Sequence, residues 1–96
     1  MTVELSDTSR VARGQGHLSA DMGTQTVLMS IDHGKYIGLD AVGTAIWQRL
    51  AEPVSVRDLC AQLMSAFAAD AAELRRDVLA FLTRLHAYGL VDIDPA

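Results

Sequence analysis

The chain has 96 residues, of which 50% are apolar and 21% are charged. This length suits one domain with a single modest core, and this composition excludes an intrinsically disordered chain. The formal net charge of −4 disfavours binding to duplex nucleic acid, which needs clustered Lys and Arg to neutralise phosphates.

The N-terminal residues 1–15 are polar and show no periodicity. We expect a flexible arm there, with room for a short strand near its end, followed by a single domain over residues 16–96. No apolar stretch near the N-terminus has the length of a signal peptide, and no apolar run approaches the roughly 20 residues of a membrane span. The single cysteine, Cys60, excludes an intrachain disulfide. We therefore expect a cytoplasmic protein without a membrane partner.

Three short strands are expected next, over residues 17–20, 26–32 and 35–39. The middle one, TVLMSID, alternates in the manner of a strand. The dipeptide His33-Gly34 then predicts a tight two-residue hairpin turn, beside which Asp32 and Lys35 would face each other. In the last strand, Ile37 and Leu39 share one face and Tyr36 lies on the other. That strand therefore has apolar side chains on both faces.

Three helices are expected after the strands, each opened by a capping residue. The capping residues are Asp40, Ser55 and Asp70. On the third helix we expect a buried stripe of Leu74, Val78, Phe81 and Leu85. Gly89, followed by Leu90, predicts a Schellman stop at its end. Strands followed by helices without alternation indicate an α+β fold, here a winged helix-turn-helix with a three-stranded antiparallel sheet followed by three helices.

The sequence contains no catalytic or metal-binding motif. The histidines His17, His33 and His86 have no partner at ligand spacing, and no phosphate-binding loop occurs. No Ser, His and Asp are arranged as a nucleophile with its base. Cys60 occupies a position in the second helix where a small core residue belongs. We expect a protein that is not an enzyme and has no cofactor and no metal.

Two surfaces carry more apolar character than a simple core requires. One flank of the third helix combines leucines with potentially cationic groups. Its members are Arg75, Leu79, Leu82 and His86. This flank is either part of a wide buried face or an apolar groove edged by charge, the kind of surface that receives a peptide. The strand over residues 35–39 is a candidate edge strand, to which a peptide can add as a further strand.

Several motifs in this order resemble the PqqD-like family, whose members are also called RiPP recognition elements. The motifs are GKYIGLDAVGTAIWQRLAEPVSVRDLCAQL and RDVLAFLTRLHAYGLV. They cover roughly residues 17–93, and the segment GLD-x-VGT-x-IW is similar to the standalone leader-binding proteins of lasso-peptide biosynthesis. The resemblance implies a winged helix-turn-helix that is not catalytic. It also implies binding of the leader segment of a ribosomally synthesised precursor, which is presented to a separate cysteine leader peptidase before the lasso cyclase acts.

Carried onto this chain, the resemblance implies a leader peptide that adds to the third strand and lies against the third helix. The expected peptide-binding residues are Lys35, Tyr36, Ile37, Gly38, Leu39, Arg75, Leu79, Leu82 and His86. We expect Gly38 to let a leader side chain approach the strand closely. We also expect Leu82→Asp to weaken leader binding without unfolding the domain.

Two alternatives stay open at this point. The first is a peptide chaperone of the same family that serves a radical-enzyme pathway such as pyrroloquinoline quinone biosynthesis. The second is a DNA-binding winged helix, whose recognition helix over residues 55–67 would have Arg57 as its only Lys or Arg. One arginine is a poor surface for phosphates.

Overall fold

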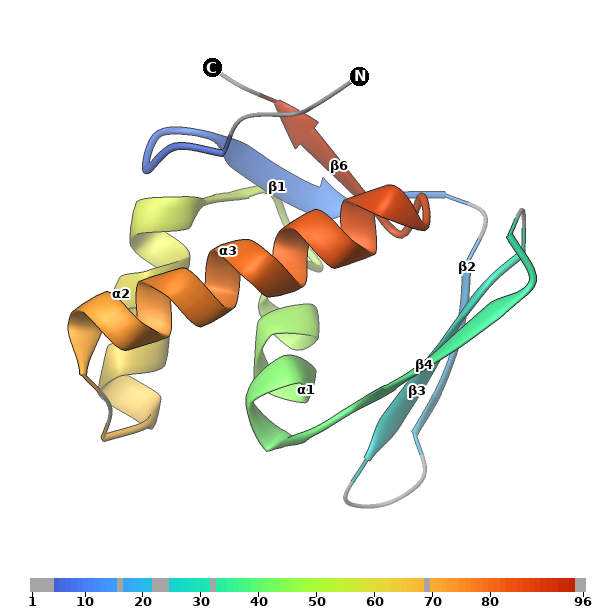
Figure 1. Cartoon of the computed structure of the whole chain (residues 1–96), viewed down its shortest axis with the longest axis horizontal. Helices are drawn as coiled ribbons and strands as arrows, with labels where there is room; N and C mark the ends of the chain where they lie inside the picture. The colour runs from blue at the N-terminus through green and yellow to red at the C-terminus, as the bar shows by residue number, and fades with distance from the viewer. Residues whose placement is uncertain (1–4, 16, 22–24, 32, 69, 95–96) are drawn as a thin grey trace.

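The computed structural model describes residues 5–15, 17–21, 25–31, 33–68 and 70–94. The elements are β1 (Arg10–Arg13), β2 (His17–Asp21), β3 (Thr26–Ser30), β4 (Lys35–Leu39), α1 (Ala41–Arg49), β5 (Val54–Ser55), α2 (Val56–Ala66), α3 (Ala71–Ala87) and β6 (Val91–Asp94). The α+β class and the three helices are confirmed. The described residues form two three-stranded antiparallel sheets, where the sequence predicted one (Figure 1).

The expected sheet has the strand order β2-β3-β4. Its inner face is apolar, because Leu28, Ile37 and Leu39 are all buried. The hairpin between β3 and β4 differs from the prediction. Ser30 pairs with Lys35, so the connection has four residues, with Gly34 at a φ of 61°. The predicted two-residue turn is therefore wrong, and the predicted partner of Lys35, Asp32, lies outside the described residues.

The second sheet has the order β5-β1-β6 and joins the two ends of the chain. Its central strand β1 pairs with β6 from Arg10, opposite Asp94, to Arg13, opposite Val91. The strand that the sequence allowed near the end of the N-terminal arm is thus central to this sheet, and the folded part of the chain begins before residue 16. Val11 is buried to 1% exposure, so this strand belongs to the core.

The three helix starts form as the sequence predicts. The side chains of Asp40, Ser55 and Asp70 accept hydrogen bonds from backbone N–H groups three residues further on, at 2.7, 3.1 and 3.0 Å. Each bond satisfies a donor that the first turn of a helix leaves without a partner. The caps therefore fix where each helix begins.

The end of α3 is the predicted Schellman motif. Gly89 has a φ of 71°, and its N–H donates to the carbonyl of His86 at 3.0 Å. The N–H of Leu90 donates to the carbonyl of Leu85 at 2.9 Å, which completes the motif. This turn reverses the chain and directs it into β6.

The buried face of α3 differs from the prediction by one position. Leu82 has no exposed surface, whereas Phe81 is only half-buried. Strand β6 of the second sheet also contacts α3, so the core around this helix includes an element that the sequence did not predict. Leu82 is therefore a core residue, and its assignment to an exposed peptide-binding flank is corrected.

We predict that Gly89→Ala destabilises the fold by about 1 kcal/mol, because an L side chain at positive φ is strained. Urea denaturation followed by circular dichroism measures the free energy of unfolding. Gly38→Ala is the matched control, since a Cβ at that position meets no atom within 4 Å and its φ is ordinary. Equal unfolding free energies for the two variants would contradict the prediction.

We also predict that Leu82→Asp prevents folding, because it places a carboxylate in the apolar core. The expected result is loss of the cooperative thermal transition in circular dichroism. Thr83→Asp, at the exposed neighbouring position, introduces the same charge and should keep the transition. A folded Leu82→Asp variant would show that the side chain can reach solvent.

Candidate functional site

Strand β4 forms one edge of its sheet. In the order β2-β3-β4 it pairs with β3, and no other described strand lies on its second side. Lys35, Tyr36 and Gly38 are exposed, whereas Ile37 and Leu39 point into the core. The predicted edge strand is thus present, and its outer backbone groups are available to a further strand.

The outer face of the same sheet carries an apolar surface. The strand register places Leu18, Met29 and Tyr36 in one row across it. Tyr36 is 73% exposed and Leu18 is 56% exposed. Gly38 lies on this face too, in a row with Val27. A strand added to β4 would place alternate side chains on this face, next to Tyr36.

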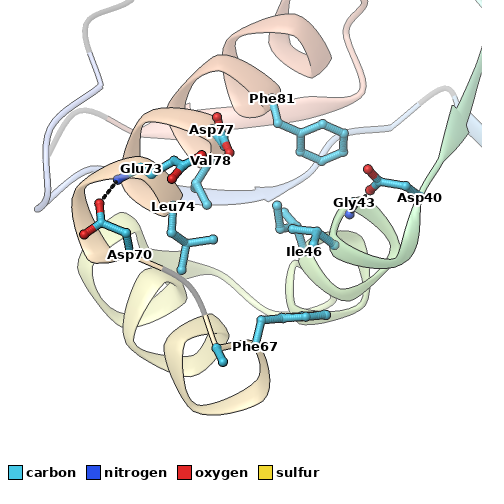
Figure 2. Close-up of a pocket in the computed structure, with 12 residues that line it drawn as sticks. Asp40, Gly43, Ile46, Phe67, Asp70, Glu73, Leu74, Asp77, Val78 and Phe81 are labelled. Atoms are coloured by element: carbon cyan, nitrogen blue, oxygen red, sulfur yellow. Dashed lines mark hydrogen bonds between the residues drawn. The ribbon is translucent and has the colours of Figure 1, made fainter.

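A groove of about 560 Å³ begins at Asp40, the residue that follows β4. It runs between α1 and α3, and Figure 2 shows Phe81 pointing from α3 toward the start of α1. The lining residues are Asp40, Val42, Gly43, Ile46, Phe67, Ala68, Asp70, Glu73, Leu74, Asp77, Val78 and Phe81. The groove therefore has an apolar floor and continues from the end of the edge strand.

Gly43 on α1 lies in the groove beside Asp40 and the ring of Phe81. A Cβ there would lie 3.4 Å from Cε1 of Phe81 and 3.2 Å from the carboxylate of Asp40. A glycine in the first turn of a helix costs about 1 kcal/mol of propensity relative to alanine. Here the nearest atom to such a Cβ belongs to the capping carboxylate of Asp40, and the ring of Phe81 lies at van der Waals distance.

The rim of the groove is acidic. Its charged residues are Asp40, Asp70, Glu73 and Asp77, and no Lys, Arg or His lines it. The carboxylates of Asp40 and Asp70 already accept hydrogen bonds from helix N–H groups. Glu73 and Asp77 form no ion pair with any other described residue. The groove therefore has a negative rim that the described part of the chain leaves uncompensated.

The predicted helix flank lies on a different side of α3. Arg75 and Asp77 are two residues apart, which is about 200° around a helix. The Arg75 Nε donates to the Asp7 carboxylate at 2.8 Å, next to the N-terminal segment. Leu79 and His86 share the Arg75 side and are half-buried. The predicted flank thus lies about 200° around α3 from the groove residue Asp77, and its Arg75 contacts the N-terminal segment.

Three residues of α3 that line the groove lie outside the peptide-binding positions that the sequence predicted. Glu73, Asp77 and Phe81 recur every four residues, so they form one stripe. That spacing was visible in the sequence. The interpretation placed Phe81 in the core stripe and assigned no peptide-binding role to Glu73 and Asp77, so the stripe was not recognised.

Cys60 on α2 is half-buried near the Arg75–Asp7 ion pair. Burial raises the pKa of the Cys60 thiol; the positive charge of Arg75 opposes the rise and the negative charge of Asp7 adds to it. A raised pKa leaves little of the nucleophilic thiolate at neutral pH. Cys60 therefore packs as a small side chain.

The described residues contain neither a candidate metal site nor a candidate membrane-spanning helix. No group of three or more His, Cys, Asp or Glu side chains in this part of the chain is placed to hold a metal ion. Among the described helices, none combines the length and the apolar character needed to cross a membrane.

Comparison with known proteins gives one family and two related structures. Residues 25–91 match the family PqqD, coenzyme PQQ synthesis protein D. The structure of TbiB1 in complex with the TbiA(beta) leader peptide is 28% identical, with a TM-score of 0.76, over 84% of this chain and 94% of the other. Lasso peptide synthetase B1, complexed with the leader peptide, is 24% identical, with a TM-score of 0.73, over 85% and 96% of the two chains.

A search of curated sequences found no match. The family match nevertheless spans the three helices, strands β3 and β4, and the groove between α1 and α3. The resemblance that the sequence motifs indicated is confirmed. The chain belongs to the PqqD family.

Proposed function

We propose that this protein binds the leader segment of a ribosomally synthesised precursor peptide, as a RiPP recognition element of the lasso peptide synthetase B1 type. One observation carries the proposal: TbiB1, solved with a leader peptide, shares the fold over 84% of this chain at 28% identity. The free edge of β4 and the adjoining groove are surfaces of the kind that hold an extended peptide.

In the proposed binding mode the leader pairs with β4 as an additional strand and continues into the groove that begins at Asp40. Ordering a flexible peptide costs entropy, so the complex needs both backbone hydrogen bonds and buried side chains. Strand β4 supplies the backbone groups, and the apolar floor of the groove supplies the burial. Lys35, Tyr36 and Gly38 are the exposed positions beside the added strand.

We propose that the protein has no catalytic role of its own. It would hold the precursor for a separate cysteine leader peptidase and then for the lasso cyclase. Tethering a substrate in this way raises its effective concentration at the enzyme. The gain requires no chemistry from the tethering domain.

A second candidate is a peptide chaperone for pyrroloquinoline quinone biosynthesis, which the description of the matching family supports. The two solved structures favour the lasso pathway, since both are complexes with a leader peptide and one of the proteins is a lasso peptide synthetase B1. The binding mode is the same in both proposals. The precursor that binds distinguishes them.

We predict that the leader of the precursor encoded beside this gene binds the purified chain at tens of micromolar or tighter, measured by fluorescence anisotropy. Two synthetic leaders, N-methylated at alternate residues in opposite phases, test strand addition. Along an edge only every second N–H points to the neighbouring strand. One phase should therefore abolish binding and the other should largely preserve it. Equal effects of both phases would contradict strand addition.

We also predict that Ala68→Trp weakens leader binding more than about tenfold, because the indole fills the groove, where one large apolar contact contributes about 1.5–3 kcal/mol. Ala68 is exposed and lines the groove, so the domain should remain folded. Ala61→Trp, exposed on α2 away from the groove, is the matched control and should bind normally. Unchanged binding by Ala68→Trp would place the leader elsewhere.

A further inference from the structure

The groove combines an apolar floor with a negative rim, and each part constrains its occupant. Val42 and Phe81 are half-buried on the two helices that border it. Phe67 also lines the groove, below Leu74 and Ile46 in the view of Figure 2. This floor suits an apolar side chain, because burying one stabilises a complex by removing apolar surface from water. The floor alone does not distinguish one apolar peptide from another.

Three of the four carboxylates on the rim have a stabilising role within the domain, and Asp77 does not. Asp40 and Asp70 cap α1 and α3. Glu73 lies in the first turn of α3, where the helix dipole stabilises a carboxylate. Asp77 lies one turn further, beyond the range of that effect. It is also four residues from Glu73, a spacing at which like charges repel each other on a helix.

No described cation forms an ion pair with Glu73 or Asp77. Arg75 pairs with Asp7 on a different side of α3. No basic residue lines the groove, and neither Glu73 nor Asp77 forms an ion pair with a described residue. A positive charge brought by the bound peptide would remove the repulsion and add attraction. Charge complementarity therefore identifies the chemistry of the occupant.

We infer that the leader segment in the groove carries an apolar anchor flanked by at least one Lys or Arg, which pairs with Asp77 and Glu73. This inference rests on the proposed leader-binding function and specifies which leaders the chain selects. The apolar side chain occupies the floor between α1 and α3. The cation lies at the rim on the α3 side and favours basic leaders over acidic ones.

The experiment compares the wild-type chain with Glu73→Gln/Asp77→Asn, which removes both charges and keeps their size. Asp92→Asn/Asp94→Asn, on exposed positions of β6, is the matched control with the same change in net charge. The probes are the synthetic leader of the neighbouring precursor gene and a version with its Lys and Arg residues replaced by Gln. Anisotropy gives the affinity at about 50 mM and about 500 mM NaCl, a range over which exposed ion pairs are progressively screened.

The groove variant should bind the natural leader about fivefold more weakly than wild type at low salt, as expected for two partly exposed ion pairs. The β6 control should bind as wild type does. The leader with Gln in place of Lys and Arg should bind wild type more weakly than the natural leader does. It should bind the groove variant and wild type with equal affinity. At the higher salt concentration, the two chains should bind the natural leader with equal affinity. Thermal unfolding checks that all variants remain folded.

Two results would overturn the inference while leaving leader binding intact. In the first, wild type and the groove variant bind the natural leader equally. In the second, a leader without Lys or Arg binds wild type as tightly as the natural one. If wild type binds no leader at all, the proposed function fails and the inference fails with it.

Discussion

Helix α3 buries Leu74, Val78, Leu82 and Leu85 in the core, and both sheets depend on this packing. Strand β6 follows the Schellman turn of α3 directly and contacts the helix. On the other side, the buried hydroxyl of Ser30 on β3 donates to the carbonyl of Tyr88 at 2.7 Å. The burial of one helix face therefore positions the terminal sheet and the β3–β4 hairpin relative to each other.

This arrangement leaves two surfaces of the site without a partner inside the described part of the chain. Strand β4 uses one edge to pair with β3 and leaves the other free. Between helices α1 and α3, the groove extends from Asp40 and Gly43 to Phe67. An edge and a groove that meet at Asp40 can hold one continuous extended peptide, with backbone pairing at one end and side-chain burial at the other.

The electrostatics of the site follow from the same geometry. Capping residues at the starts of α1 and α3 bring Asp40 and Asp70 to the groove, and the pitch of α3 adds Glu73 and Asp77. Arg75 of α3 lies on another side of the helix, where it pairs with Asp7. The groove is thus more negative than the net charge of −4 over the whole chain would suggest. Its preference among peptides depends on this local imbalance.

Features that depend on neighbouring residues could be predicted from the sequence: the three N-caps, the Schellman stop, the strands β2, β3 and β4, and the α+β class. Each is encoded within a few residues by hydrogen bonding or by periodicity. Its family motifs also indicated the PqqD-like fold and a leader-binding role.

The second sheet could not be predicted from the sequence, because Arg10 and Asp94 have no local signal that pairs them. Strand β6 of that sheet contacts α3, and in the folded chain Leu82 is buried and Phe81 lines the groove. A helix can bind a partner only with the faces that the rest of the chain leaves uncovered. Which faces are covered depends on packing between segments that are distant in the sequence.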